Sequence, residues 1–402
     1  MTEAHHIRRH ETYRDRVDSP GPKRLLSIDG GGIRGLISIE ILERIETLLR
    51  EAYGQPELVL ADYFDYVGGT STGAIIATGI SLGMTMDDIR GFYLHGAKVM
   101  LQRAWVFQRL RYQFRADRLT AALRERLGDT RLGDPGLEGI PPVAERKAHP
   151  LRTLLLLVMY RCDTDSPWPL SNNPKAKYNR TREEDGNNIY LPLWKLIRAS
   201  TAAPTYFDPE EVIVGKQKCI FIDGAITPYN NPSFLLYTMA TLEPYNLKWQ
   251  RGEDRMLLVS VGTGSIPNVN KNLRKKHMNL LYYAGRVPSA LIYANTVEAD
   301  KLCRIYGRSL LGDKIDSEIG DLLEPLSQAP TRTKDFLYAR YDPDLTEMGL
   351  TKLGLFPRIK PEDVLPLISG KHVNELREVG KTYARNVSLE HFGPFVPASV
   401  SA

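Results

Sequence analysis

The stretch Asp65-Tyr-Val-Gly-Gly-Thr-Ser-Thr-Gly73 decides which fold the rest of the sequence favours. Apolar and aromatic residues at 63–67 predict a strand, and small and apolar residues at 72–80 predict a helix. Ser71 would lie on the turn between them, where glycines two positions before and after it permit the strained geometry of a nucleophile elbow. We therefore predict that Ser71 is a nucleophile. The elbow around it comprises Gly69, Thr70, Thr72 and Gly73.

A second glycine-rich segment precedes the elbow. Arg24-Leu-Leu-Ser-Ile-Asp29 predicts a short strand that leads into Gly30-Gly-Gly-Ile-Arg-Gly35, and apolar residues from 36 to 53 recur at helical spacing. Strand, loop, helix and the elbow strand make a βαβ unit, which favours an α/β fold with a mostly parallel central sheet flanked by helices. The i, i+4 pairs expected to support the helix are Glu40–Arg44 and Glu46–Arg50.

The loop between this strand and helix is suited to stabilise negative charge. Its N–H groups lie at the positive end of the helix dipole, and glycines leave them accessible. A serine that attacks a carbonyl needs such donors for the oxyanion, and each is typically worth about a hundredfold to a thousandfold in rate. The predicted oxyanion hole comprises Gly30, Gly31, Gly32, Ile33, Arg34 and Gly35.

The serine also needs a base, and Asp223 is the candidate. Residues 217–222 predict a buried strand that leads into Asp223, and the small residues Gly224 and Ala225 follow it. The carboxylate can then lie at the same edge of the sheet as Ser71. An ordinary aspartate is a weak base, but partial desolvation and close contact with one hydroxyl would let the pair act on esters.

Two other interpretations of these motifs stay open. The loop 30–35 also fits the dinucleotide fingerprint G-x-G-x-x-G, with Glu51 as the acidic residue some twenty positions on, which would make the chain a nucleotide-binding or signalling module. Alternatively, the serine belongs to a Ser-Asp-His triad of the α/β-hydrolase type. The histidines that follow Asp223 in the required order are His277, His372 and His391.

The bulk composition favours a globular protein: 402 residues, 42% hydrophobic and 25% charged. The longest apolar run, Leu154–Met159, is too short to cross a bilayer, so we expect a cytoplasmic protein. Cys162, Cys219 and Cys303 are widely spaced, which favours reduced, buried thiols over a disulfide framework or structural zinc. No cofactor and no metal site are expected.

The chain is predicted to have three parts: a flexible tail over 1–23, a catalytic domain over 24–270 and a mainly helical part over 271–402 that packs on it. Residues 97–131 carry nine Lys or Arg against three Asp or Glu. This segment is either a lid or membrane-contact element, or a helical pair with aromatic residues inward, which we favour. The interleaved residues are Trp105, Phe107, Tyr112 and Phe114 with Arg103, Arg109, Arg111, Arg115 and Arg118.

Five ordered segments give the chain a resemblance to patatin-like phospholipases. The match is strong over residues 24–265 and weaker to about 385. The segments are Asp29-Gly-Gly-Gly-Ile-Arg-Gly35, Gly69-Thr-Ser-Thr-Gly73, Ala199-Ser-Thr-Ala-Ala-Pro-Thr-Tyr-Phe207, Asp223-Gly-Ala225 followed by Asn230-Asn231-Pro232, and Val261-Gly-Thr-Gly264.

The resemblance implies a patatin-like three-layer α/β fold and hydrolysis of fatty-acyl esters by a Ser71–Asp223 dyad, with Gly31, Gly32 and their neighbours as oxyanion donors. It also implies that Arg34 holds the loop or a phosphate. Relatives of this length include effectors of anti-phage defence that a cyclic nucleotide switches on and that degrade membrane phospholipid. We therefore expect peripheral contact with phospholipid at the bilayer surface. A cyclic-nucleotide activator and a homo-oligomer are further hypotheses, and no nucleic-acid polymer is expected as a partner.

Overall fold

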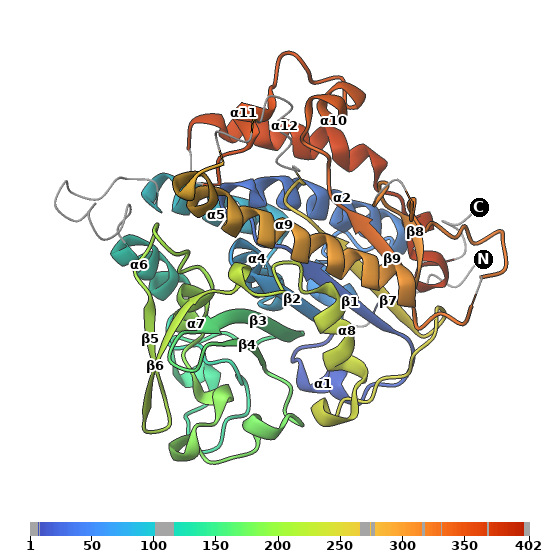
Figure 1. Ribbon diagram of the computed structural model, residues 1–402. Helices are drawn as coiled ribbons and strands as arrows, with labels where there is room; N and C mark the ends of the chain where they lie inside the picture. The colour runs from blue at the N-terminus through green and yellow to red at the C-terminus, as the bar shows by residue number, and fades with distance from the viewer. Residues whose placement is uncertain are drawn as a thin grey trace.

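The computed structural model describes residues 7, 9–100, 116–265, 274, 278–315, 318–330, 332–367 and 370–397. Within these residues one mixed sheet of nine strands runs through the molecule in the order β5-β6-β3-β2-β1-β7-β9-β8, with β4 paired to β3 (Figure 1). The strands are β1 (Lys23–Ile28), β2 (Tyr66–Thr70), β3 (Leu154–Arg161), β4 (Ser166–Ser171), β5 (Glu210–Val214), β6 (Gln217–Asp223), β7 (Met256–Val261), β8 (Gly307–Leu311) and β9 (Phe336–Tyr341).

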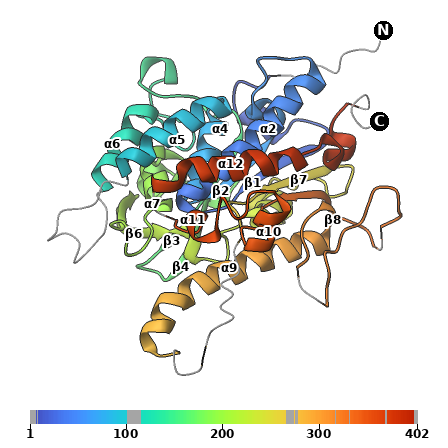
Figure 2. The same ribbon diagram turned by 90° about the horizontal axis from the view of Figure 1, so that it is seen from above.

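Helices cover both faces of this sheet, which is therefore the middle of three layers (Figure 2). On one side lie α2 (Gly35–Tyr53), α4 (Thr72–Ser81) and α5 (Met86–Met100), and on the other lies α9 (Leu280–Tyr306). α8 (Ser233–Thr241) packs against α9. The remaining helices are α1 (Arg14–Val17), α3 (Leu60–Tyr63), α6 (Ala116–Leu127), α7 (Leu193–Ser200), α10 (Glu347–Lys352), α11 (Pro361–Val364) and α12 (Val373–Tyr383). The predicted α/β class with a mostly parallel sheet is confirmed.

The βαβ unit forms where the sequence predicts it. β1 pairs in parallel with β2, and α2 connects them before ending at Gly54 in a left-handed conformation with φ of 60°. Of its two expected ion pairs, Glu46–Arg50 forms at 2.7 Å. Glu40 is buried instead, and its carboxylate binds Arg377 of α12 at 2.6 Å and Arg90 of α5 at 3.2 Å. The expected Glu40–Arg44 pair is thus wrong, because Glu40 faces the neighbouring helices rather than solvent.

The strands β2 and β6 meet end to end along one edge of β3. Residues 68–70 pair with 156–158 of β3, and Asp223 pairs with Met159, the next position along the same strand. β4 occupies the opposite edge of β3 over both stretches. Because β2 runs parallel to β3 and β6 antiparallel to it, the carboxyl ends of β2 and β6 face each other. Cys219, Phe221 and Asp223 of β6 are buried whereas Lys218 and Ile220 are exposed, so the predicted buried strand is buried on one face only.

Two strands of the last third of the chain extend the sheet. β9 pairs in parallel with β7, and β8 pairs in parallel with β9. The sequence predicted a mainly helical pattern there, and α9 to α12 account for it. The strands were missed because β8 is short and β9 is interrupted by the polar residue Arg340, whose side chain is buried in an ion pair.

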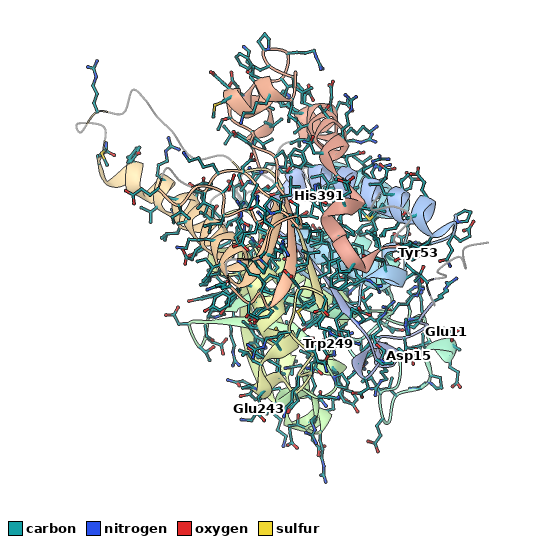
Figure 3. All side chains as sticks on the ribbon, turned by 90° about the vertical axis from the view of Figure 1, so that its right-hand side faces the viewer. Glu11, Asp15, Tyr53, Glu243, Trp249 and His391 are labelled. Carbon is teal, nitrogen blue, oxygen red and sulfur yellow. The ribbon has the colours of Figure 1, made fainter. Side chains whose placement is uncertain are left out.

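The ends of the chain pack more closely than predicted. Tyr13 and Arg16, within the expected tail, are fully buried, and Trp249 donates from Nε1 to the carbonyl of Val17 at 3.1 Å (Figure 3). Near Pro394, Phe392 and Phe395 are buried as well. Hydrogen bonds with residues distant in the sequence order these two stretches, so no local periodic pattern could have predicted their order.

Several predictions fall on residues that the structure does not describe. These are the aromatic and arginine residues at 103–115 and His277. Of the three cysteines, Cys219 and Cys303 are buried as predicted, whereas Cys162 is exposed, and all three are free thiols. Among the described residues, the helices include none with both the length and the apolar character to span a bilayer.

Candidate active site

The serine at residue 71 occupies a strained turn between β2 and α4. Its backbone has φ 55° and ψ −121°, a conformation that non-glycine residues rarely adopt and that marks functional turns. The flanking glycines are required by contact, since a Cβ at Gly69 would lie 2.1 Å from the carbonyl oxygen of Gly73. One at Gly73 would lie 2.2 Å from the carbonyl oxygen of Ile28. Side chains at these positions would push the turn apart.

The structure brings Ser71 and Asp223 into direct contact. The Ser71 hydroxyl donates to Oδ2 of Asp223 at 2.6 Å, and the N–H of Ala225 donates to Oδ1 at 2.8 Å. Burial raises the pKa of Asp223 from its usual value of 3.8 to about 6, while the two hydrogen bonds and the charge of Arg198 oppose this rise. The carboxylate is therefore a stronger base than an ordinary aspartate and is still mostly ionised at neutral pH.

A hydrogen bond to Ser200 holds the turn in place on the side of α7. The backbone N–H of Ser71 donates to Oγ of Ser200 at 3.0 Å, and that hydroxyl donates to the carbonyl of Val158 at 2.6 Å. Ser200 thereby links the nucleophile to β3 at the point where β2 and β6 meet. The sequence contained Ser200 within a family segment, but nothing in the residue pattern indicated this role.

The predicted oxyanion loop lies over the nucleophile, because a Cβ at Gly30 would be 3.3 Å from the Cβ of Ser71. Most of its N–H groups already have acceptors. The N–H of Gly30 donates to Asn230 O at 3.1 Å, that of Ile33 to Leu367 O at 2.8 Å, and those of Arg34 and Gly35 to carbonyls within the loop. The N–H groups of Gly31 and Gly32 donate to no acceptor in the part of the chain that the structure describes. These two are free to bind a substrate oxygen.

Residues far away in the sequence support the glycine loop. Thr263 donates to the carbonyl of Gly30 at 3.1 Å. The Tyr93 hydroxyl donates to Gly32 O and forms a second hydrogen bond, of 2.5 Å, with the hydroxyl of Thr72 in the elbow. Gly35 packs against the same two side chains, since a Cβ there would lie 2.6 Å from Thr72 Oγ1 and 2.9 Å from the Tyr93 hydroxyl. Tyr93 thus joins the loop to the elbow, which sequence reasoning missed.

A buried ion pair fixes the end of β1 just before the loop. Asp29 binds Arg340 of β9 through both carboxylate oxygens, at 2.7 and 3.2 Å, and Arg340 also binds Asp342 at 2.9 Å. The two carboxylates raise the pKa of Arg340 and keep it charged. The guanidinium of Arg34 makes no hydrogen bond or ion pair within the described residues, and burial lowers its pKa. Arg340, and not Arg34, holds this end of the loop.

The alternative site residues lie apart from the serine. His391 shares a hydrogen bond of 3.0 Å with the hydroxyl of Tyr341, and His372 faces Asp363 and Glu375 (His391 is labelled in Figure 3). Neither histidine contacts Asp223 or Ser71. Glu51, the acidic residue of the dinucleotide interpretation, lies in the last turn of α2 and not at the end of β2, where the fingerprint requires it. Within the described residues no group of three His, Cys, Asp or Glu side chains is arranged to hold a metal ion.

The fold and site place the chain among α/β proteins that carry a serine at a strained strand-to-helix turn. The family model for patatin-like phospholipase matches residues 26–237, more than half of the chain. The chain belongs to the patatin-like phospholipase family.

Individual proteins similar in sequence to this chain are patatins. Over 265 residues the chain is 28% identical to Patatin-T5 of Solanum tuberosum, covering 61% of this chain and 62% of the relative. Over 276 residues it is 26% identical to Patatin-17 of Solanum cardiophyllum, covering 63% of each. The chain thus spans less than two thirds of the length of these curated relatives. The crystal structure of VipD from Legionella pneumophila matches with a TM-score of 0.37 and 13% identity, covering 91% of this chain and 66% of that one, which is too low to support an argument.

Proposed function

We propose that the chain is a serine lipid acyl hydrolase that cleaves fatty-acyl esters of phospholipids. The observation that carries this proposal is the 2.6 Å hydrogen bond from the elbow hydroxyl of Ser71 to the buried carboxylate of Asp223. Membership of the patatin-like phospholipase family supports the lipid ester as substrate. The two free N–H groups of the neighbouring glycine loop supply what a nucleophilic serine otherwise lacks.

In the first half of the proposed reaction, Ser71 transfers its proton to Oδ2 of Asp223 while its oxygen attacks the acyl carbonyl. The carbonyl oxygen becomes an oxyanion, and the N–H groups of Gly31 and Gly32 stabilise it. Collapse of this intermediate breaks the ester bond, and Asp223 returns the proton to the departing alcohol. The products are a lysophospholipid and an acyl-enzyme on Ser71.

In the second half, Asp223 takes a proton from water, and the resulting hydroxide attacks the acyl-enzyme. The same two N–H groups stabilise the second oxyanion. Ser71 leaves with the proton that Asp223 held, and the fatty acid is released. One carboxylate with a pKa of about 6 serves both steps, because it accepts and returns a proton near neutral pH.

Exposed apolar side chains near the site support contact with a lipid surface. Ile226 follows Asp223 by three residues and is 40% exposed, and Leu367, whose carbonyl contacts the glycine loop, is also 40% exposed. Leu291 of α9 is 57% exposed, on a helix that is tied to Asn230 through Thr296 at 3.1 Å. We propose that these side chains enter the bilayer surface while the acyl chain reaches Ser71. Activation by a cyclic nucleotide and homo-oligomerisation stay predictions.

Fatty-acid release from phosphatidylcholine liposomes tests the dyad. Ser71→Ala and Asp223→Asn should each lower the rate by at least about a thousandfold, because each removes a group that acts in both steps. The matched controls are Ser327→Ala and Asp208→Asn, which alter exposed residues outside the site and should keep the wild-type rate. An active Asp223→Asn variant together with an inactive His372 or His391 variant would replace the dyad with a triad. Full activity in Ser71→Ala would refute a serine mechanism.

A further inference from the structure

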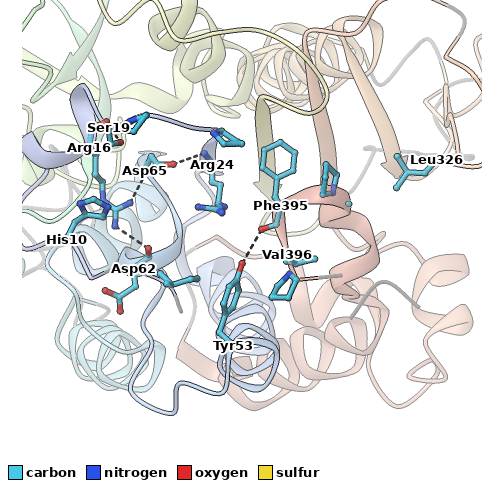
Figure 4. Close-up of a pocket in the computed structure, with 16 residues that line it drawn as sticks. His10, Arg16, Ser19, Arg24, Tyr53, Asp62, Asp65, Leu326, Phe395 and Val396 are labelled. Atoms are coloured by element: carbon cyan, nitrogen blue, oxygen red, sulfur yellow. Dashed lines mark hydrogen bonds and ion pairs between the residues drawn. The ribbon is translucent and has the colours of Figure 1, made fainter. Parts of the chain in front are cut away.

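A large cavity lies at the opposite end of the central strands from Ser71. It has a volume of about 780 Å³, and its walls include Arg24 near the start of β1, Asp65 just before β2 and Tyr53 at the end of α2 (Figure 4). Because β1 and β2 are parallel, their amino ends share one edge of the sheet, and the glycine loop and Ser71 lie at the other. The cavity is therefore separate from the candidate active site, and the proposed function gives it no role.

The two carboxylates in the cavity wall are fully engaged. Asp65 binds Nη1 of Arg16 at 2.8 Å through Oδ1 and accepts the backbone N–H of Arg24 at 2.8 Å through Oδ2. Asp62 binds Arg152 through Oδ1 and accepts the N–H of Val59 at 3.0 Å through Oδ2. The charges of Arg16 and Arg152 offset those of the two acids, so neither carboxylate is available to another cation.

Arg24 is a cation of the cavity wall that forms no ion pair with these two carboxylates. Its guanidinium forms no ion pair with a carboxylate within the described residues, and its Nε is buried without a partner. The group does share a side-chain hydrogen bond with the hydroxyl of Tyr63, and the nearby charge of Asp65 favours its charged form. The group rests on the face of Tyr63, 4.7 Å from the ring centroid, and Figure 4 shows it directed into the space between Asp62, Tyr53 and Phe395. A guanidinium carries five N–H donors, so one that bonds a neutral hydroxyl and pairs with no carboxylate keeps donors for an anion in the cavity.

Apolar and aromatic groups form the rest of the wall. Tyr53 donates its hydroxyl to the carbonyl of Phe395 at 3.3 Å, which fixes its ring beside the cavity, and Val396 lies next to it. The prolines of the wall are Pro20, Pro22, Pro394 and Pro397. The volume lies within the range of about 300–1,000 Å³ that small-molecule pockets show, and such pockets combine apolar walls with a few directed polar groups.

We propose that this cavity binds a small phosphorylated ligand with an apolar part, whose phosphate binds the guanidinium of Arg24 and whose apolar part packs against Tyr53, Phe395 and the prolines. A guanidinium fits phosphate oxygens with paired hydrogen bonds. Both a nucleotide and the head group of a lipid have this chemistry. The proposal does not rest on the activity at Ser71.

Calorimetric titration of the full chain with three probes tests the proposal. The probes are adenosine monophosphate, hexyl phosphate, which has no carboxylic ester to hydrolyse, and inorganic phosphate. We expect at least one organic probe to bind at least about tenfold more tightly than inorganic phosphate, because it adds apolar contact. Preference for adenosine monophosphate identifies a nucleotide site, and preference for hexyl phosphate identifies a lipid head-group site. Equal binding of all three probes would refute the claim that the cavity wall binds an apolar part of the ligand. No binding of any probe up to about 10 mM would refute the proposed site.

Five variants test whether the probes bind in this cavity. Arg24→Met should weaken binding by about tenfold or more and Arg24→Lys by less, whereas Arg255→Met, at the exposed start of the adjacent strand, should have no effect. If Arg24→Met does not fold, Pro22→Glu gives an independent test, because it adds a negative charge at an exposed position of the wall. Its neutral match, Pro22→Gln, should bind as the wild type does. Unchanged binding in folded Arg24→Met, or in Pro22→Glu, would overturn the assignment.

Discussion

The two ends of the central parallel strands differ in the charge that each leaves without a counterion. At the carboxyl ends, Asp223 is buried beside a hydroxyl and two N–H groups lack acceptors. At the amino ends, Asp62 and Asp65 pair with Arg152 and Arg16, and Arg24 forms no ion pair within the described residues. One end therefore holds the proposed base and oxyanion donors, whereas the other holds the proposed site for an anion. The difference shows that these sites are recognised by the polar groups that folding leaves unsatisfied, and not by the presence of charged residues alone.

The pairing of Asp65 with Arg16 predicts the largest change in stability. Asp65→Asn removes the charge that offsets a buried guanidinium, so we expect it to lower the free energy of unfolding by about 3–5 kcal/mol. Chemical denaturation measures this change. The control is Asp18→Asn, which breaks the exposed pair with Lys175 and should cost no more than about 1 kcal/mol. Equal effects of the two variants would show that burial does not strengthen the Asp65 pair.

At the carboxyl ends of the strands, removal of a buried carboxylate is expected to stabilise the protein. Asp223→Asn should raise the free energy of unfolding at pH 7 by up to about 3 kcal/mol, because a carboxyl pKa raised from 3.8 to about 6 costs about 1.4 kcal/mol per unit when the group ionises. The native state holds this proton more tightly than the unfolded state. The gain should therefore be full above pH 6 and vanish as the pH falls from 6 to 3.8. Denaturation curves at pH 4 and pH 7 measure it, and a loss of stability at pH 7 would contradict the prediction.

The smallest effect is the dependence of the rate on pH. Hydrolysis of a soluble short-chain ester should fall about tenfold per pH unit below pH 6, because protonated Asp223 cannot accept the proton of Ser71. The rate of hydrolysis measured at a series of pH values gives the apparent pKa of the acidic limb of the profile. A limb centred near pH 4 would show that Asp223 is not desolvated in the working enzyme. A flat profile down to pH 4 would remove Asp223 from the proton transfer.

The local sequence was sufficient to predict two parts of the candidate active site, the turn that carries Ser71 and the glycine loop. The elbow of Ser71 and the glycine loop each lie between a strand and a helix whose patterns are short and regular, and Gly69 is needed for close contact with Gly73 within the same turn. The fold class followed from this one βαβ unit. Asp223 was also identified from the sequence. Its strand was predicted to be buried, but β6 is buried on one face only.

Residues that hold the site from a distance were not predictable. Ser200, Tyr93 and Arg340 lie far from Ser71 in the sequence and are ordinary residues of their own helices and strands. Their roles depend on which elements become neighbours. The same holds for Arg24, which the sequence shows as the start of a strand, and only the packing around it reveals that its guanidinium lies on Tyr63 without an ion pair in the described part of the chain.

The sequence by itself determined the α/β class, the strained serine turn and the loop that faces it, because these depend on contacts between residues close in the chain. Only the tertiary structure decided that β2 and β6 meet head to head on one edge of β3. That arrangement sets Ser71 against Asp223 and buries the carboxylate, which raises its pKa. Strand order and burial arise from contacts between distant segments, so no local pattern of residues encodes them.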